Sequence, residues 1–303
     1  MKIEGEKMKK SIKSALALSL ILNLIVIYPL KYVSATSNED ADANECFQED
    51  GVIGDISDID TIRDIFSTFS HEDELNWYYV GKGKDQIAEA PRESVDFLKE
   101  NSAYYLGDTS NKVLYLTFDE GYENGHTGEI LDVLKEYKVP AAFFVVKPYI
   151  TKEPALIKRM VDEGHIVGNH SVHHPSMAQI HDKEKFEAEL KGVEDAYKEL
   201  TGEDMPKFFR PPMGKYSKES LQMTKDLGYK TIFWSFAYKD WLVNNQPAEN
   251  YALQKIGKGG HPGSIMLLHA VSNTNTKILA TVLKTFQEEG YEFKSLNDLP
   301  TES

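Results

Sequence analysis

Residues 113–121 are VLYLTFDEG, an apolar run of strand length that ends in two acidic residues and a glycine. From this run onward, short apolar segments alternate with segments of helical periodicity, the pattern of repeated βα units around a parallel sheet. We predict seven such strands, at residues 113–118, 141–146, 165–170, 207–210, 230–236, 264–269 and 291–296. The fold class is therefore α/β, and the repetition favours a barrel or a doubly wound sheet.

The segments between the strands carry helix signals of their own. One apolar face recurs at four–three spacing over Phe186, Leu190, Val193, Tyr197 and Leu200. Ser217 can cap a helix that runs to Leu227. Three helices end just before a strand in a residue suited to the left-handed cap, namely Gly164, Gly228 and Gly290.

The chain before the first strand divides into three predicted segments. Residues 1–35 combine lysines, an apolar run and a small-residue cleavage site, which predicts a signal peptide or, if uncleaved, an N-terminal membrane anchor. Residues 36–75 are acidic and rich in turn formers, so we expect a solvated linker. Residues 76–111 are an aromatic lead-in that either packs on the catalytic domain, residues 112–298, or lines a sugar site.

Composition limits the classes of function. Cys46 is the only cysteine, so an exported chain has no internal disulfide and cysteine-based catalysis is not expected. The formal charge is −14, and without residues 1–35, which carry six lysines and two glutamates, it is about −18. Such a charge argues against nucleic acid as a partner, and it is compatible with a neutral or zwitterionic glycan.

Five chemically capable residues stand at or just beyond the ends of five different predicted strands. In parallel βα folds the reactive groups gather at the carboxyl ends of the strands, where the βα loops meet. The five residues are Asp119, His170, Arg210, Asp240 and His269. We therefore expect them to lie at one end of the domain.

The segment NHSVHHP at 169–175 has the HxxxH spacing, which can place His170 and His174 on one face of a helical turn to bind a metal ion. Taken alone, the pair is more typical of a solvated turn. A catalytic zinc site adds a carboxylate and leaves one position open for water, whose pKa the metal lowers. Asp119 and Glu120 can supply a ligand and a base if the strand breaks at Gly121, because adjacent strand residues point to opposite faces.

Two further motifs can complete a hydrolytic site. RPPMG at 210–214 is a rigid loop that can aim a backbone N–H at an oxyanion, and Arg210 can orient a carboxylate; an ordinary surface loop is the other interpretation. His269 ends an apolar strand and needs a partner to fix its tautomer, for which Asp240 is the candidate. A satisfied core histidine is the alternative.

In this order, the motifs TFDEG, HSVHHP, RPPMG, KDW and LLHAVS resemble those of the polysaccharide deacetylase family, also called the NodB-homology domain or carbohydrate esterase family four. The match spans about residues 112–298. The segments FDEGYENG and LLHAVS are most similar to the subgroup that deacetylates peptidoglycan N-acetylmuramic acid in spore formers. The resemblance implies a distorted (β/α) barrel with about seven parallel strands.

The resemblance also implies a role for each matching residue. Asp119 would be the general base held by Arg210, and His269 would be the general acid tuned by Asp240. Three residues would bind the substrate: the Met213 N–H at the oxyanion, and Trp241 and Leu267 around the acetyl methyl. His170 and His174 would bind a divalent metal, with zinc favoured. Glu120 stands where most of the family has an aspartate as the third ligand, so it either ligates at a shifted position or leaves a weaker site.

Together these features predict an exported, metal-dependent deacetylase of peptidoglycan strands. It would act at the cell wall or the outer face of the membrane, including the intermembrane space of the forespore, on the route to muramic-δ-lactam in spore cortex. Deacetylation of N-acetylglucosamine or chitin-like glycans is the alternative substrate hypothesis. A glycan-binding relative without catalysis is the alternative class, and the presence of both Asp119 and His269 argues against it.

Overall fold

The computed structural model describes residues 73–300. The predicted signal or anchor segment at 1–35 and nearly all of the predicted linker at 36–75 lie outside this range. Within residues 73–300, no helix has the length and apolar character needed to cross a membrane.

The main sheet is built around β3 (Val113–Glu120), which pairs in parallel with β4 (Ala141–Val145) and with β9 (Ser264–His269). From β4 the sheet continues in parallel through β5 (Ile166–Asn169), β6 (Phe208–Phe209) and β8 (Lys230–Ile232). The short strands β10 (Glu292–Phe293) and β2 (Ala103–Tyr104) pair with β3 and β8. All seven predicted strands are confirmed, and β2 is the strand of this main sheet that the sequence did not indicate.

The sheet curls until β9 meets the segment after β8. Phe236 forms an isolated parallel bridge with Met266, and the Leu267 N–H donates to the Phe236 carbonyl over 2.8 Å. This narrow junction closes what is otherwise an open sheet. The predicted distorted (β/α) barrel is therefore confirmed.

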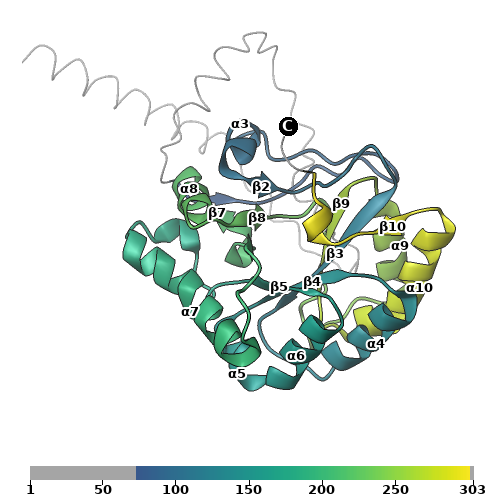
Figure 1. The fold of residues 1–303 in the computed structure, drawn as a ribbon. Helices are drawn as coiled ribbons and strands as arrows, with labels where there is room; N and C mark the ends of the chain where they lie inside the picture. The colour runs from purple at the N-terminus through teal and green to yellow at the C-terminus, as the bar shows by residue number, and fades with distance from the viewer. Residues whose placement is uncertain (1–72, 301–303) are drawn as a thin grey trace, which may run out of the picture. The chain divides into compact units, whose positions relative to one another are not determined.

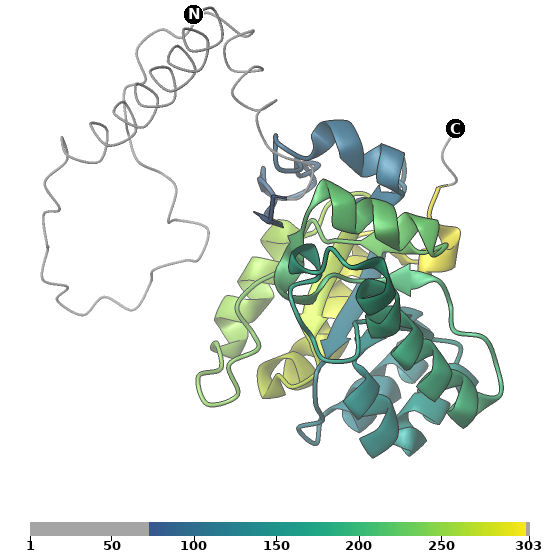
Figure 2. The ribbon, with the colours of Figure 1, turned by 90° about the vertical axis from the view of Figure 1, so that its left-hand side faces the viewer.

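Helices cover the outside of the strands, as Figures 1 and 2 show. They are α4 (Thr127–Tyr137), α5 (Lys147–Lys152), α6 (Pro154–Asp162), α7 (Lys183–Thr201), α8 (Lys218–Asp226), α9 (Glu249–Gly259) and α10 (Asn273–Glu288). The predicted face at 186–200 belongs to α7, and Ser217 caps α8 by accepting from the Ser220 N–H at 3.0 Å. Gly164, Gly228 and Gly290 all have positive φ, as their cap positions require.

Strand alternation separates two apolar cores. Val113 and Tyr115 point into the barrel, where they pack with Phe144 and Ile265. Leu114, Leu116 and Phe118 point outward into a larger core shared with the helices. Because successive side chains of a strand point to opposite faces, the odd-numbered residues of β3 face into the barrel and the even-numbered residues face the helices.

The aromatic lead-in packs on the domain through β1 (Leu75–Asn76), which pairs antiparallel with β7 (Lys215–Tyr216). Trp77 is 7% exposed and stacks on Phe233 with ring centroids 4.1 Å apart. Its indole N–H donates to the Trp234 carbonyl at 2.9 Å. A short helix, α3 (Val95–Leu98), continues as a 3-10 turn at Lys99–Asn101 and completes the lead-in.

Candidate active site

Strand direction and alternation bring the predicted site residues to one end of the barrel. Asp119 is paired in register with His269 on the neighbouring strand. Side chains alternate between the two faces along a strand. Asp119 is four residues after the inward-facing Tyr115, and His269 is four residues after the inward-facing Ile265, so both face into the barrel. His170 and Arg210 follow β5 and β6 directly, at the same carboxyl-terminal edge of the sheet.

Arg210 is fully buried and holds Asp119. Its Nη1 donates to Asp119 Oδ1 at 2.7 Å, while its Nε donates to the Ile232 carbonyl at 3.0 Å. The guanidinium also lies 4.3 Å from the centroid of the Phe144 ring. Strand β8 ends at Ile232 rather than at the predicted residue 236, and the carbonyls of Ile232 and Phe233 face this guanidinium.

These contacts keep the Asp119 carboxylate ionised. Burial by itself would raise the pKa of Asp119, but the positive charge of Arg210, with smaller effects of His170 and His269, brings the pKa below its ordinary value. Asp119 is therefore a carboxylate near neutral pH, as a general base must be.

His170 and His174 lie together beside Asp119. Their ring centroids are 4.8 Å apart, and His170 Nε2 is 3.6 Å from Asp119 Oδ2. The Arg210 carbonyl lies 2.8 Å from His170 Nδ1 and can accept its proton, which leaves the Nε2 lone pair toward the site. Burial lowers the pKa of His170 to about 4 and also lowers that of His174, so both rings are neutral, the state that binds metals.

The loops that carry these groups have strained backbones. Ser171, His174 and Met213 have φ values of 69°, 58° and 60°, in the left-handed region that disfavours residues with a side chain. The Asn169 side chain accepts from the Ser171 N–H at 2.9 Å and helps to hold this turn. Such strain is concentrated at functional sites, where surrounding contacts maintain it.

His269 forms the second buried pair of the candidate site with Asp240. Its Nδ1 is 2.7 Å from Asp240 Oδ1, and its backbone N–H donates to Asp240 Oδ2 at 2.9 Å. Burial by itself would lower the pKa of His269, but the Asp240 carboxylate raises it above its ordinary value. His269 is therefore poised to carry a proton that it can donate.

The three predicted substrate-binding residues differ in exposure. The Trp241 ring lies 5.6 Å from the His269 ring and is 46% exposed, whereas Leu267 is buried two residues before His269. The Met213 side chain is 54% exposed, on a 3-10 turn at Pro212–Gly214. The exposed Trp241 ring beside His269 is suited to contact a sugar or an acetyl group.

Glu120 lies elsewhere, and the structure does not bring its carboxyl group together with the two histidines. Strand β3 does not break before Gly121, because Glu120 is still paired with Val145 and its carbonyl accepts from the Val146 N–H at 3.3 Å. Its side chain therefore shares the outward face of Phe118, toward the helices. In residues 73–300, no three His, Cys, Asp or Glu side chains are grouped closely enough to hold a metal ion.

Three supporting residues were not found by sequence reasoning. The Asn275 amide donates to Asp240 Oδ2 at 2.6 Å, and Asn169 orders the turn before His174. Glu189 accepts from the Val172 and His173 N–H groups at 3.1 and 3.0 Å. Each is an ordinary helix or strand residue in the sequence, so no local pattern marks it.

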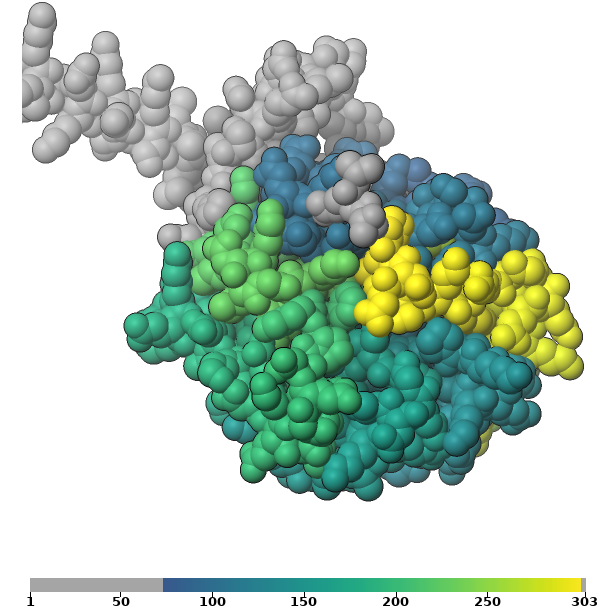
Figure 3. Space-filling model, in the orientation of Figure 1, coloured from purple at the N-terminus to yellow at the C-terminus, as the bar shows by residue number. Residues whose placement is uncertain are grey.

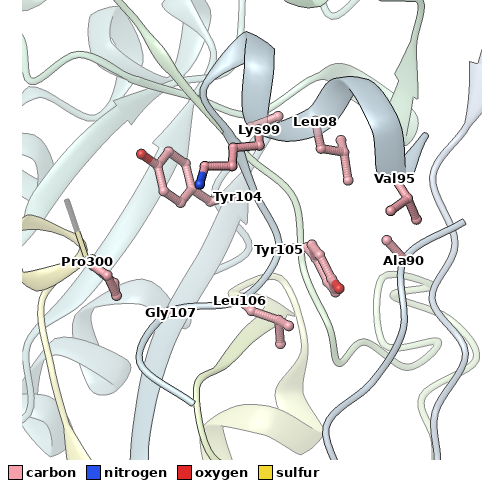
Figure 4. A pocket seen from close by; sticks show the side chains of 10 residues that line it. Ala90, Val95, Leu98, Lys99, Tyr104, Tyr105, Leu106, Gly107 and Pro300 are labelled. Atoms are coloured by element: carbon pink, nitrogen blue, oxygen red, sulfur yellow. The ribbon is translucent and has the colours of Figure 1, made fainter. Parts of the chain in front are cut away.

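A separate cavity lies far from this chemistry. It has a volume of about 360 Å³ and is lined by residues of the segment 90–107 and by Pro300 (Figure 4). The last described residues lie beside the lead-in on the surface (Figure 3). The Gly107 N–H donates a hydrogen bond to the Gly263 carbonyl, directly before the first residue of β9. His269 is the last residue of that strand, so the cavity and the candidate site lie at opposite ends of β9.

A parallel barrel with an ionised carboxylate and a protonatable histidine at the carboxyl ends of adjacent strands is typical of an enzyme that uses acid–base catalysis. The family model of polysaccharide deacetylases matches residues 106–232. The chain is 42% identical to the peptidoglycan-N-acetylmuramic acid deacetylase PdaA of Bacillus subtilis over 74% of this chain and 85% of that protein. The chain belongs to the polysaccharide deacetylase family.

The solved structure of Bacillus subtilis PdaA, a family 4 carbohydrate esterase, matches with a TM-score of 0.73 and 41% identity, covering 75% of this chain and 97% of that one. A peptidoglycan-N-acetylglucosamine deacetylase of Bacillus cereus is 30% identical over 66% of this chain and 94% of that protein. Both relatives are named as deacetylases of peptidoglycan, but their names differ in the sugar.

Proposed function

We propose that this protein is a hydrolytic N-deacetylase of peptidoglycan that removes the acetyl group of N-acetylmuramic acid. The observation that carries the proposal is the register of Asp119 with His269, which sets an ionised carboxylate beside a protonatable imidazole at one edge of the sheet. The similarity to PdaA over most of both chains supports the same substrate class.

Asp119 supplies the base. Water attacks the carbonyl carbon of the acetamide, and its proton passes to the Asp119 carboxylate as the new C–O bond forms. Arg210 fixes Asp119 Oδ1 at 2.7 Å, which leaves Oδ2 directed toward His170 and the reacting water. Arg210 thus positions the base and keeps its pKa low without touching the substrate.

His269 supplies the acid. When the C–N bond breaks, the leaving nitrogen takes the proton of His269, and acetate and a free amine are the products. Asp240 holds the ring through Nδ1, so Nε2 is the atom that donates. The Met213 N–H would stabilise the oxyanion, and Trp241 and Leu267 would enclose the acetyl methyl.

His170 and His174 are the residues that would hold a divalent cation, for which zinc is the natural candidate with imidazole ligands. The fit rests on two neutral rings 4.8 Å apart, one of them with its tautomer fixed by the Arg210 carbonyl. When bound there, the cation would supply Lewis-acid polarisation of a carbonyl oxygen and would lower the pKa of a nearby water.

N-acetylglucosamine is the second candidate sugar, favoured by the similarity to the Bacillus cereus deacetylase. Muramic acid differs by a lactyl carboxylate, for which a cationic contact is expected. Lys215 is occupied by Glu74, with Nζ 2.8 Å from Oε1. Lys239 is exposed, directly before Asp240, and forms no ion pair within residues 73–300, so it is the better candidate for that contact.

Mass analysis of muropeptides tests the proposal. Peptidoglycan is incubated with the purified protein, with and without a chelator, and then digested and analysed for the sugar that has lost its acetyl group. Loss from muramic acid supports the proposal, and loss from glucosamine alone would favour the second candidate. The Asp119→Asn variant is the control, and full acetate release by it would contradict the role of Asp119.

The cellular setting is a finer part of the same proposal. A muramic acid deacetylase acts outside the cytoplasm, on cell-wall strands, and the acidic surface of the chain is compatible with such glycans. Formation of muramic-δ-lactam in spore cortex would require expression during sporulation. Loss of the lactam from spores that lack the gene is the measurement that tests it.

A further inference from the structure

Trp241 reaches the candidate site on a turn that buries little of its own surface. The Trp241 ring is 46% exposed and lies 5.6 Å from the His269 ring. Residues 242–247, which complete this turn, form neither helix nor strand and are all exposed or half-buried. A segment with so few buried side chains depends on polar contacts to keep one conformation.

One side chain, that of Gln246, holds the turn from within. Its Nε2 donates to the Asp240 carbonyl at 2.8 Å and to the Leu242 carbonyl at 3.0 Å, the two carbonyls that flank Trp241. Its Oε1 accepts from the Ser272 hydroxyl at 2.5 Å. Because backbone carbonyls can only accept, the amide nitrogen must face the turn and the amide oxygen must face the helix α10.

The first turn of α10 is a firm anchor for this side chain. Ser272 is fully buried and caps the helix by accepting from the Asn275 N–H at 3.1 Å. The Thr274 hydroxyl donates to the Pro247 carbonyl at 2.8 Å, directly after Gln246 in the chain. The helix itself packs on the main apolar core. Gln246 therefore ties an exposed turn to a buried element.

The carboxylate of Asp240 has separate support. Its Oδ2 accepts from the Asn275 amide at 2.6 Å and from the His269 N–H at 2.9 Å. Gln246 bonds to the backbone carbonyl of Asp240 and not to this carboxylate. Loss of the Gln246 amide should therefore release the turn and its tryptophan ring, while the pair of Asp240 and His269 keeps its own hydrogen bonds.

We propose that Gln246 is a positioning residue that fixes the Trp241 ring against the acyl group of the substrate and thereby selects acetyl over larger acyl groups. The inference rests on the proposed function, in which Trp241 and Leu267 enclose the acetyl methyl. Leu267 is held in β9 by its pairing with Thr117, whereas the Trp241 side of the enclosure is only as rigid as its turn. A rigid enclosure discriminates against one extra methylene by about 10–200-fold.

Acyl selectivity of the purified full chain tests this inference. Peptidoglycan strands whose amino sugars carry N-acetyl or N-propionyl groups are compared by the release of acetate and propionate. In Gln246→Ala we expect a higher KM for the acetyl substrate and a fall of about tenfold in the acetyl preference in kcat/KM. The decline of activity at high pH should stay in place, because Asp240 still holds His269. An unchanged preference in folded Gln246→Ala overturns the inference.

Two further variants separate the amide from a general effect on the turn. Gln246→Glu can still accept from Ser272, but an ionised carboxylate cannot donate to the two carbonyls, so it should match Gln246→Ala. Asn245→Ala is the matched control, because Asn245 is exposed in the same turn, and its acyl preference should stay within about twofold of the parent. In a chain that already carries Trp241→Ala, Gln246→Ala should cause no further loss of preference. A second loss of the same size would contradict action through Trp241.

A fluorine label on tryptophan gives a readout that needs no turnover. The Trp241 resonance, identified by its absence from Trp241→Phe, should follow the titration of His269 because the two rings are 5.6 Å apart. This response should shrink in Gln246→Ala and persist in Asn245→Ala. A parent chain that releases no acetate while the label responds in this way refutes the proposed function and leaves the positioning by Gln246 standing. Acetate release with parental selectivity and parental label response in Gln246→Ala refutes this inference alone.

Discussion

At the scale of the residue, adjacent carboxyl groups in one strand have opposite protonation preferences. The pKa of Asp119 is lowered by Arg210 despite burial, while burial and the neighbouring carboxylates of Glu123 and Asp119 raise the pKa of Glu120 well above its ordinary value. The difference arises from the two faces of the strand, since Arg210 donates to Asp119 on the inward face, whereas Glu120 lies near the Glu123 carboxylate on the outward face. A carboxyl group that stays neutral within the fold has a measurable effect on stability.

We predict that the free energy of unfolding of the parent chain falls as pH rises, and that this fall is absent in the Glu120→Gln variant. The native state holds the Glu120 proton above the pH at which the unfolded chain, with an ordinary pKa near 4.5, has released it. Stability therefore falls as pH rises from that value toward the native pKa, by up to about 1.4 kcal/mol per pH unit. Urea unfolding between pH 5 and 8 should show the advantage of the variant growing with pH.

Glu123→Gln is the matched control, because hydrogen bonds lower the pKa of Glu123 despite its burial and so reverse the sign. Glu123 contributes stability that is present above its ordinary pKa and lost as pH falls. An unchanged pH slope in Glu120→Gln would show that Glu120 is solvated or paired in solution.

We also predict that Asp240→Asn shifts the alkaline limb of activity. His269 must be protonated to act as the acid, so activity is lost as pH rises through its pKa, which Asp240 raises. Without that carboxylate the pKa falls and the limb moves to lower pH, with a loss in kcat/KM at neutral pH of up to about 10²–10⁴-fold, the usual contribution of a general acid. The acid limb, set by Asp119, should stay in place, and His173→Ala should leave both limbs unchanged. An unmoved alkaline limb in Asp240→Asn would assign it to another group.

At the scale of the element, the sequence predicts the strands well because each is an apolar run next to a helix with a clear stop. It misses β1, β2 and β7, because strands of two residues each are too short to form a pattern. Among the site residues, the positions of Asp119 and His269 follow from strand ends and parity. The place of Glu120 follows from the same parity, but Gly121 suggested a break that the pairing with β4 prevents.

The contacts that support the site could not be predicted in this way. Asn275 reaches Asp240 across 35 residues of chain, and Asn169 donates to Tyr229 across 60. Such pairs depend on how α10 and β8 pack on the sheet, and neither residue type has a periodicity that marks it. Long-range polar contacts are therefore the part of the site that only the fold reveals.

One element, β5, should be sensitive to a single added methyl group. A Cβ on Gly168 would lie 2.7 Å from the Phe144 ring and 3.3 Å from the Phe208 carbonyl, inside the barrel. We expect Gly168→Ala to destabilise the protein by about 1–3 kcal/mol through overpacking. It should also lower metal affinity, because His170 is two residues further on. Thermal unfolding and zinc titration measure the two effects.

The control for this prediction is Gly257→Ala in α9, where an added Cβ meets nothing within 4 Å. Alanine is the better helix former there, so stability should rise by about 0.5–1 kcal/mol. If Gly168→Ala were as harmless as this control, the barrel interior at β5 would be looser than the contacts of Phe144 indicate.

At the scale of the whole molecule, the lead-in and the catalytic loops depend on each other. The backbone N–H of Trp77 donates to the Gly214 carbonyl at 2.7 Å. Strand β1 pairs with β7, which begins directly after the 3-10 turn that carries Met213. The Trp77 ring packs between Phe233 and Tyr105, and the Phe233 carbonyl accepts from Arg210 at 3.4 Å. A segment outside the barrel therefore supports both the loop that carries Met213 and the arginine that holds Asp119.

We predict that Trp77→Ala lowers the free energy of unfolding by about 3–5 kcal/mol, the usual cost of removing a buried large aromatic side chain. Because the ring supports the loop of Met213, kcat should fall at temperatures where the variant is still folded, and Trp77→Phe should recover part of both losses. Tyr78→Ala is the matched control: Tyr78 is 47% exposed, and its removal should change stability by no more than about 0.5 kcal/mol. A folded Trp77→Ala variant with unchanged kcat would show that the lead-in stabilises the barrel without positioning the active site.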